Sequence, residues 1–401
     1  MSFTIVSTFQ SVRVPYKKHA SFFQKLFQEL AKKANMVILP QIDLKNIERS
    51  MLKYEDSLKK AQIIFHNTGM FLSQFPHQES YRHWLEAMLR ARGFCWAHQH
   101  HCENREEWKY VHKINTFIST LNPFLIDADI FFKKEEELYT LLEDHKIPTL
   151  KRFTQELEKA NSFPIVLKHH NTTKGLGVSF IESEEQWKKL FPTQESWQKQ
   201  KHFYTIMEFV ESPSDFFTHY RVYTVGKGHI LAVVLCYSHV KKSDDVRIID
   251  QESIYDNPKN PLFLNRRLIA SNRTYGGKQI PLHPNSDSRN ISVEEQKILQ
   301  DHAITNQEIP GILKNYATEA AKILSAKGLC LLGQDWIQDK NGNFFCLEMN
   351  WGPELGSFDT VYNKGKGDDE ETRIIVAQKI AAAIIEDSKQ EQKQQTQRMQ
   401  K

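Results

Sequence analysis

The sequence predicts an α/β protein with more than one domain, and three observations lead to this fold class. The 401 residues exceed the roughly 150 residues of a usual domain. In residues 1–115, strand-like runs alternate with helical patterns, which is typical of a parallel, doubly wound sheet. Hydrophobic residues make up 40% and charged residues 25%, as in ordinary globular proteins.

The N-terminal part is expected to form one domain over residues 1–120. Its candidate strands are Thr4–Phe9, Met36–Leu39, Gln62–His66 and Phe94–Ala97. Its candidate helices are Ser21–Lys33, Leu44–Lys59 and Glu79–Ala91. The first strand lacks a following GxGxxG turn, so the pattern does not support a dinucleotide site.

The rest of the chain contains more strands. A helix is predicted from Phe132 to His145, and it ends at Lys146-Ile147-Pro148. The further candidate strands are Pro164–Lys168, Gly177–Glu182, Tyr204–Val210, Arg221–Val225, His229–Tyr237, Leu331–Ile337 and Phe344–Met349. The further candidate helices are Val293–Thr305 and Ile312–Lys327. The polar insertion Lys241–Leu264 is read either as a lid or as a surface loop. Residues 387–401 lack an apolar stripe and are predicted to be a disordered tail.

Charge and cysteine usage exclude several classes of protein. With 53 Lys+Arg against 49 Asp+Glu, a net charge of +4 argues against a dedicated nucleic-acid binder. The N-terminus does not resemble a signal peptide, and no run is apolar enough to span a bilayer, so we expect a cytoplasmic protein without a membrane partner. An odd count of 5 scattered cysteines fits a reducing compartment. Two interpretations stay open for the cluster Cys95, His98, His100, His101 and Cys102: it is a zinc site, or it is the end of a strand that enters a polar loop.

The most informative stretch is Gly333–Asn350. Asn341-Gly342 between two apolar runs indicates a hairpin with a two-residue turn, which would pair Lys340 with Asn343. Asp335 would then face Glu348, with Cβ atoms about 5 Å apart. Asn350 would lie on the same face, because side chains alternate along a strand.

Two carboxylates and an amide on one face are what a hard divalent cation requires. A solvated hairpin that carries acidic residues by chance is the alternative. Apolar flanks imply burial, and a buried pair of like charges needs compensation.

Two further segments each allow a purely structural and a functional interpretation. Lys168–Val178 joins two strands and contains glycines, threonines and lysines. The segment either presents N–H groups, hydroxyls and positive charge to phosphate or forms an ordinary hairpin turn. It does not match a Walker A loop, and no protein-kinase motif occurs in the chain. Thr205–Glu211 is either a strand beside an adenine ring or a strand that enters a polar linker.

Together and in this order, the three segments resemble the ATP-grasp superfamily over roughly Lys133–Ile385. The resemblance implies an α+β grasp of two lobes, at residues 121–211 and 212–386, which follows the N-terminal Rossmann-like domain. It implies ATP and Mg²⁺, with one or two ions, as cofactors. The metal ligands would be Asp335, Glu348 and Asn350.

The resemblance also implies roles for other residues. Arg221 would meet the transferred phosphate, and Asn272 would line the reaction centre. Glu208, Phe209 and Val210 would hold the adenine, with Glu211 near the ribose. The residues implied at the phosphates are Lys133, Lys168, Thr173, Lys174, Gly175 and Gly177.

Ser271–Gly277 is similar to a segment of the glutathione synthetase and ribosomal-protein glutamate ligase branch, although Ala270 stands where that branch has an arginine. The resemblance therefore implies an ADP-forming carboxylate–amine ligase that works through an acyl phosphate on an amino acid, peptide or similar small metabolite. Phosphotransfer to a hydroxyl and a non-catalytic ATP-binding regulatory protein are the alternatives. Dimerisation is common in the resembled family, so a homodimer stays open.

Overall fold

A computed structural model describes the central and C-terminal parts of the chain and short pieces of the N-terminal part. The residues described are 4–7, 29, 32, 35–38, 63–66, 118–121, 135–153, 163–169, 178–201, 204–244, 247–248, 266–267, 271, 276–282, 291–326, 331–350, 361–362 and 370–399. Within them, helices combine with sheets that are mostly antiparallel.

The N-terminal strands form a sheet of 4 strands in the order β2-β1-β3-β4. Strand β1 (Thr4–Ser7) pairs in parallel with β2 (Asn35–Ile38) and β3 (Ile63–His66), as the alternating pattern predicts. Strand β4 (Ile118–Leu121) is antiparallel to β3 and was not predicted. The helices expected on this sheet and the strand expected at Phe94–Ala97 lie outside the described residues, so the doubly wound arrangement stays a prediction.

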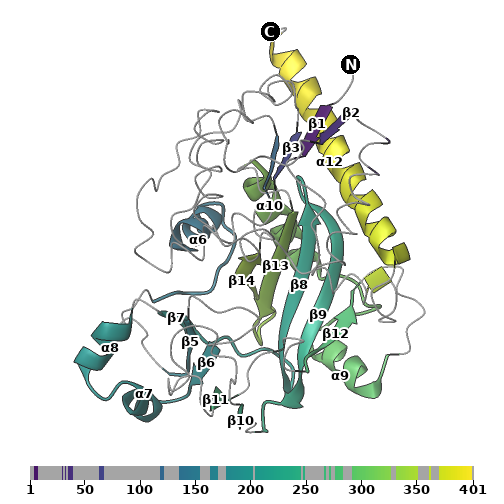
Figure 1. The fold of residues 1–401 in the computed structure, drawn as a ribbon. Coiled ribbons are helices and arrows are strands. Elements are labelled where there is room, and N and C mark those ends of the chain that lie inside the picture. The colour runs from purple at the N-terminus through teal and green to yellow at the C-terminus, as the bar shows by residue number, and fades with distance from the viewer. Residues whose placement is uncertain are drawn as a thin grey trace.

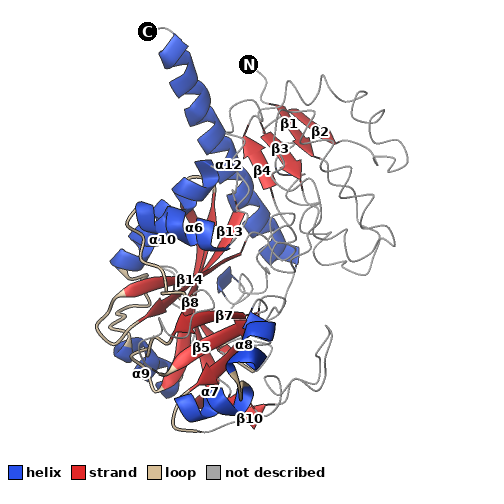
Figure 2. Cartoon of the chain, turned by 90° about the vertical axis from the view of Figure 1, so that its left-hand side faces the viewer, coloured by secondary structure: helices blue, strands red, loops and turns tan. Residues whose placement is uncertain are grey.

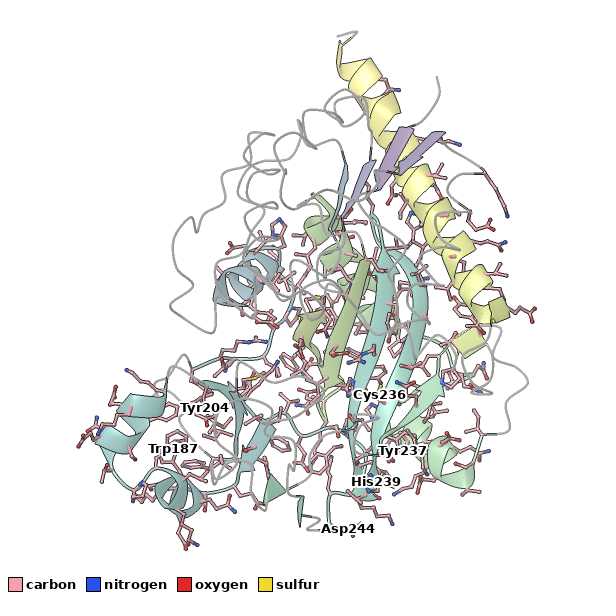
Figure 3. The ribbon with its side chains drawn as sticks, in the orientation of Figure 1. Trp187, Tyr204, Cys236, Tyr237, His239 and Asp244 are labelled. Carbon is pink, nitrogen blue, oxygen red and sulfur yellow. The ribbon has the colours of Figure 1, made fainter. Side chains whose placement is uncertain are left out.

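A separate sheet has 3 strands in the order β6-β5-β7, and we call this sheet and the segments packed on it the small lobe. Strand β5 (Ile165–His169) lies between β6 (Val178–Ile181) and β7 (Tyr204–Glu208) and is antiparallel to both. One face packs against α7 (Glu184–Leu190) and α8 (Gln194–Gln200) (Figure 2). Trp187, Phe191, Trp197 and Tyr204 cluster there, and Figure 3 labels Trp187 and Tyr204. Ile165 and Leu167 belong to this core, so Lys168 projects from the other face.

The larger sheet has 5 strands in the order β12-β9-β8-β13-β14 (Figure 1). Its strands are β8 (Phe216–Val225), β9 (His229–Lys241), β12 (Lys278–Pro281), β13 (Leu331–Gln338) and β14 (Phe344–Asn350). All neighbours are antiparallel. Each predicted strand of this region is present, although β8 begins earlier than expected, at Phe216 rather than Arg221.

The main core covers one face of this sheet. Tyr220, Val222 and Trp336 project into it and are fully buried. Helices α6 (Glu135–Asp144), α9 (Val293–Asp301) and α10 (Gly311–Ala326) supply the opposing side chains. Because strand side chains alternate, Arg221 and Asp335 lie on the opposite face. The lobe boundaries at residues 121, 212 and 386 stay predictions.

The long helix α12 (Glu370–Met399) contacts β8 and β9 (Figure 1). The side chain of Asp387 is buried and accepts hydrogen bonds from the Lys227 N–H at 2.6 Å and from His229 Nε2 at 3.0 Å. This differs from the disordered tail expected over residues 387–401. Gln, Lys and Glu are good helix formers, so the helix can continue to Met399 once Asp387 is anchored.

Three smaller findings complete the fold. None of the helices described combines the length and low polarity that a membrane crossing requires. Two of the cysteines described, Cys236 and Cys346, are buried and form no disulfide. Within the polar insertion, Arg247–Ile248 (β10) pairs with Arg266–Arg267 (β11), which follows the insertion, and residues 249–265 between them lie outside the described part.

Candidate active site

Arg221 and Asp335 form the centre of the site. They are direct neighbours across β8 and β13, and Asp335 is only 4% exposed. Arg221 Nε donates to Asp335 Oδ1 at 2.7 Å, and Nη2 donates to Oδ2 at 2.8 Å. The carboxylate of Asp335 raises the pKa of Arg221, although burial acts in the other direction. The site therefore holds a permanent, rigidly oriented positive charge.

Glu348 and Asn350 lie beside this pair. Glu348 is directly opposite Asp335, so the predicted pairing is confirmed. Asn350 Nδ2 donates to Asp335 Oδ2 at 3.3 Å. Lys168 Nζ, which comes from the small lobe, lies 3.3 Å from Glu348 Oε2. Two carboxylates, one amide and two cations from two sheets therefore meet on one face.

The turn that leads to this pairing differs from the prediction. Gln338 pairs with Phe344, the Asp339 N–H donates to Asn343 O at 2.9 Å, and Gly342 has a φ of +86°. The loop is therefore three residues long, with Gly342 in the left-handed region that favours glycine. The Asp339 carboxylate accepts both the Asn341 and Asn343 N–H groups, and this side-chain bonding favours the longer loop.

The oxygen atoms present fit a magnesium ion. Arg221 and Asn350 occupy three of the roughly four acceptor positions of Asp335, so Oδ1 keeps room for one more ligand. Glu348 and the amide oxygen of Asn350 supply the other hard donors. Within the part described, no three His, Cys, Asp or Glu side chains form a metal cluster. Magnesium does not need such a cage, because it commonly combines one or two carboxylates with phosphate oxygens and water.

The residues expected at the adenine lie at the end of β7. Glu208 Oε1 accepts the Lys151 N–H at 2.8 Å, and the Glu208 N–H donates back to Lys151 O at 3.0 Å. The rings of Phe209 and Phe180 lie 4.6 Å apart, and Val210 is half-buried. The exposed carboxylate of Glu211 pairs with Lys340 at 2.8 Å, in the β13–β14 loop. Small-lobe residues thus contact the β13–β14 hairpin at both of its ends.

Sequence reasoning missed two polar residues on the same face, His219 and Cys236. His219 Nδ1 lies 2.6 Å from Ser271 Oγ, and His219 Nε2 lies 3.8 Å from Asp335 Oδ1. Cys236 is the cross-strand neighbour of His219, and Figure 3 labels it on β9. Burial acts to lower the pKa of His219, but Cys236 and Asp335 outweigh burial and raise it. Extending the predicted strand by two residues would have placed His219 on the Arg221 face.

Several predicted residues lie outside the described part of the chain. They are Lys133, Asn272, Thr173, Lys174, Gly175 and Gly177, together with Ala270 and the cluster from Cys95 to Cys102. Their roles stay predictions.

Comparison with known proteins gives a broad likeness. No family model matches the chain, and no curated protein matches it. Among solved structures, D-alanine–D-alanine ligase from Bacillus anthracis is 11% identical with a TM-score of 0.44, over 98% of this chain and 100% of that one. The macrocyclase MdnC with precursor peptide MdnA, from Microcystis aeruginosa MRC, is 12% identical with a TM-score of 0.44, over 96% and 99%.

The ATP-grasp ligase PsnB, in complex with a minimal precursor, Mg and ADP, is 11% identical with a TM-score of 0.42, over 96% and 97%. The solved structures to which this chain is similar therefore include ATP-grasp ligases.

Proposed function

We propose that this chain is an ATP-grasp enzyme, and more narrowly an ADP-forming carboxylate–amine ligase. Its substrate would be an amino acid, a peptide or a similar small metabolite. The observation that carries the proposal is the face on which Arg221, Asp335 and Asn350 are joined, with Glu348 and Lys168 beside them. This face combines hard oxygen ligands with two cations, as the binding of magnesium and phosphate requires.

Charge balance supports the proposal. Each carboxylate is next to a cation: Asp335 beside Arg221 and Glu348 beside Lys168. A magnesium–nucleotide complex brings both signs of charge. Asp335, Glu348 and Asn350 would hold the metal ion. Lys168 would turn toward phosphate oxygens, while Arg221 would stay paired with Asp335 and offer its remaining N–H groups to them. When bound, Mg²⁺ supplies charge stabilisation and orients the phosphates.

The remaining nucleotide contacts follow from the resemblance. Lys133, Thr173, Lys174, Gly175 and Gly177 would contact the phosphates. Glu208, Phe209, Val210 and Glu211 would line the base and ribose. Closure of the Gly175 loop would exclude water that could hydrolyse a reactive intermediate.

The proposed reaction has two steps. A carboxylate oxygen of the substrate attacks the γ-phosphorus, and the bond to ADP breaks. The nitrogen of an amine then attacks the acyl carbon, phosphate leaves, and the nitrogen loses a proton. Arg221 would stabilise charge on the transferred group, since its guanidinium is fixed by Asp335. Asn272 would lie near the acyl carbon.

The test measures ADP release from Mg-ATP with pooled amino acids and short peptides, followed by mass analysis of the products. A product with a new amide bond, together with free phosphate, supports the ligase. Phosphate that stays on the product would indicate a phosphotransferase. Nucleotide binding without turnover in any pool would indicate a regulatory protein.

A matched pair of variants connects the activity to the site. Glu348→Gln should abolish ADP release. Glu319→Gln changes an exposed glutamate that pairs with Lys322, so it should leave ADP release unchanged. Equal activity in both variants would contradict the assignment of Glu348.

A further inference from the structure

The position of Glu348 depends on a single bulged residue, Leu347. Below it, the β13–β14 pairing runs Gln338–Phe344, Ile337–Phe345 and Trp336–Cys346. Above it, Asp335 pairs with Glu348. Leu347 is therefore the extra residue on β14, and pairing shifts by one residue across it.

This shift decides which face carries the second carboxylate. If the pairing near the turn continued unshifted, Leu347 would lie opposite Asp335 and Glu348 opposite Gln334. Gln334 is fully buried on the core face and donates to Thr224 Oγ1 and Ala317 O, each at 2.9 Å. A slip of one residue moves every side chain to the other face. The bulge therefore keeps Glu348 beside Asp335 and out of the core.

Two side chains from outside the hairpin bind the carbonyl of the bulged residue. Arg152 Nη2 donates to Leu347 O at 2.9 Å, and the Tyr139 hydroxyl donates to the same oxygen at 3.3 Å. The Arg152 guanidinium also lies over the Tyr139 ring, with Cζ 3.2 Å from its centroid, and Nη1 donates to Leu150 O at 2.9 Å. The Arg152 guanidinium is thus held by two carbonyl oxygens and one aromatic ring.

The segment that carries Arg152 also binds the strands around it. The Cys346 N–H donates to Pro148 O at 2.8 Å, and the Leu150 N–H donates to Cys346 O at 3.2 Å. On its other side, Arg152 forms a β-bridge with Met207 of β7. Residues 148–152 therefore connect the bulge in the large sheet to the small-lobe strand that ends at Glu208.

We propose that Arg152 is a positioning residue for the metal-binding face, which it maintains by holding the Leu347 carbonyl so that Glu348 stays opposite Asp335. This inference rests on the proposed function, because it assigns a task to a carboxylate that would bind magnesium. Arg152 is not expected to touch substrate or nucleotide. Groups that orient a metal ligand typically change metal affinity or activity by about 10- to 100-fold when they are removed.

The experiment measures Mn²⁺ binding in the presence of ADP by electron paramagnetic resonance, so its readout does not depend on turnover. We expect Arg152→Ala to weaken Mn²⁺ binding by about tenfold. Arg152→Lys should recover part of this loss, since an ammonium can donate to Leu347 O but cannot also reach Leu150 in the same geometry. Lys151→Ala is the matched control, because Lys151 is exposed and contributes its backbone to Glu208.

The outcomes separate this inference from the proposed function. If the wild-type chain binds no Mn²⁺ with ADP, the metal site itself is refuted. If the wild-type chain binds Mn²⁺ and Arg152→Ala binds it equally well, the role of Arg152 is refuted and the proposed function stands. If Arg152→Ala does not fold, Arg152→Lys serves as the test, since it cannot keep the bonds to Leu347 O and Leu150 O together; Mn²⁺ affinity equal to that of the wild-type chain in that variant also overturns the inference.

Discussion

Substituting the two proposed metal-binding carboxylates should have the same effect on activity and different effects on stability. Asp335→Asn and Glu348→Gln each remove one anionic ligand. Because a bound metal ion supplies several kcal/mol of charge stabilisation, ADP release should fall by about 10³-fold in either variant.

The stability difference follows from the partners of the two carboxylates. The Asp335 side chain is 6% exposed and its partner Arg221 is 22% exposed, and the two form a bidentate pair. Leaving such a buried guanidinium without its counter-charge costs about 3 kcal/mol. Glu348 and Lys168 meet in a single contact at 3.3 Å rather than in a bidentate pair, and Glu348 is 23% exposed, so breaking this contact costs about 1 kcal/mol.

These free energies convert to a measurable difference in Tm. At about 2–4 °C per kcal/mol, Asp335→Asn should lower Tm by about 8 °C and Glu348→Gln by about 3 °C. Differential scanning fluorimetry measures both. Adding Arg221→Met to Asp335→Asn should recover much of the lost Tm without restoring ADP release, because it removes the unpaired charge. Equal Tm values for the two single variants, or ADP release retained in either, would refute this reasoning.

Three further predictions concern other parts of the chain. Lys174→Ala should raise the Kd for ATP about tenfold, as isothermal titration can measure, because one phosphate-binding charge is lost. Asp387→Ala should lower the free energy of unfolding by about 1–3 kcal/mol, because the half-buried Lys227 N–H loses this acceptor. Burial lowers the pKa of His302 from 6.5 to about 4. Its native form stays neutral while the unfolded chain takes up a proton, so stability should fall by about 3 kcal/mol between pH 6.5 and pH 4.

Each of these predictions has a result that would contradict it. An unchanged Kd for ATP in Lys174→Ala would remove that lysine from the phosphate site. An unchanged unfolding transition in Asp387→Ala would show that α12 is held by other contacts. His302→Gln should flatten the pH dependence of unfolding, and a slope equal to that of the wild-type chain would mean that His302 is not its source.

The sequence predicted the larger elements because their apolar spacing is regular. Strands β5 to β9 and β13 to β14 follow the predicted runs, and α6 ends at Asp144, two residues before Lys146, where φ is +60°. The helical continuation to Met399 was not predicted, because a Gln-rich segment without an apolar stripe gives no signal for the burial of Asp387. That burial depends on the β8–β9 turn, which lies far away in sequence.

The pairing of Asp335 with Glu348 was predicted correctly, although the turn from which it was derived was predicted wrongly. A two-residue loop at Asn341-Gly342 without a bulge gives the same pairing at Asp335 as a three-residue loop with a bulge at Leu347. The two differences cancel each other. The sequence contains the Asn-Gly signal for the turn, whereas the bulge depends on Arg152 and Tyr139, which are remote in sequence.

The pairing of β8 with β9 also shifts by one residue, which explains why Cys236 was not predicted at the site. Thr224 pairs with Ile230 but Tyr223 pairs with Ala232, so Leu231 is an extra residue. Without it, His219 would lie opposite Leu235, a fully buried core residue, rather than opposite Cys236. The Leu231 carbonyl accepts a hydrogen bond from the Tyr362 hydroxyl.

The composition of the site is therefore determined by two one-residue insertions, each with its carbonyl bound by a side chain from outside the hairpin. At Leu347 the donors are Tyr139 of α6 and Arg152 of residues 148–152, and at Leu231 the donor is Tyr362. Strand periodicity can place Arg221 and Asp335, but it cannot show which residues of the neighbouring strands share their face. Because one residue of slip exchanges site side chains for core side chains, stabilising either bulge stabilises both the site and the core beneath it.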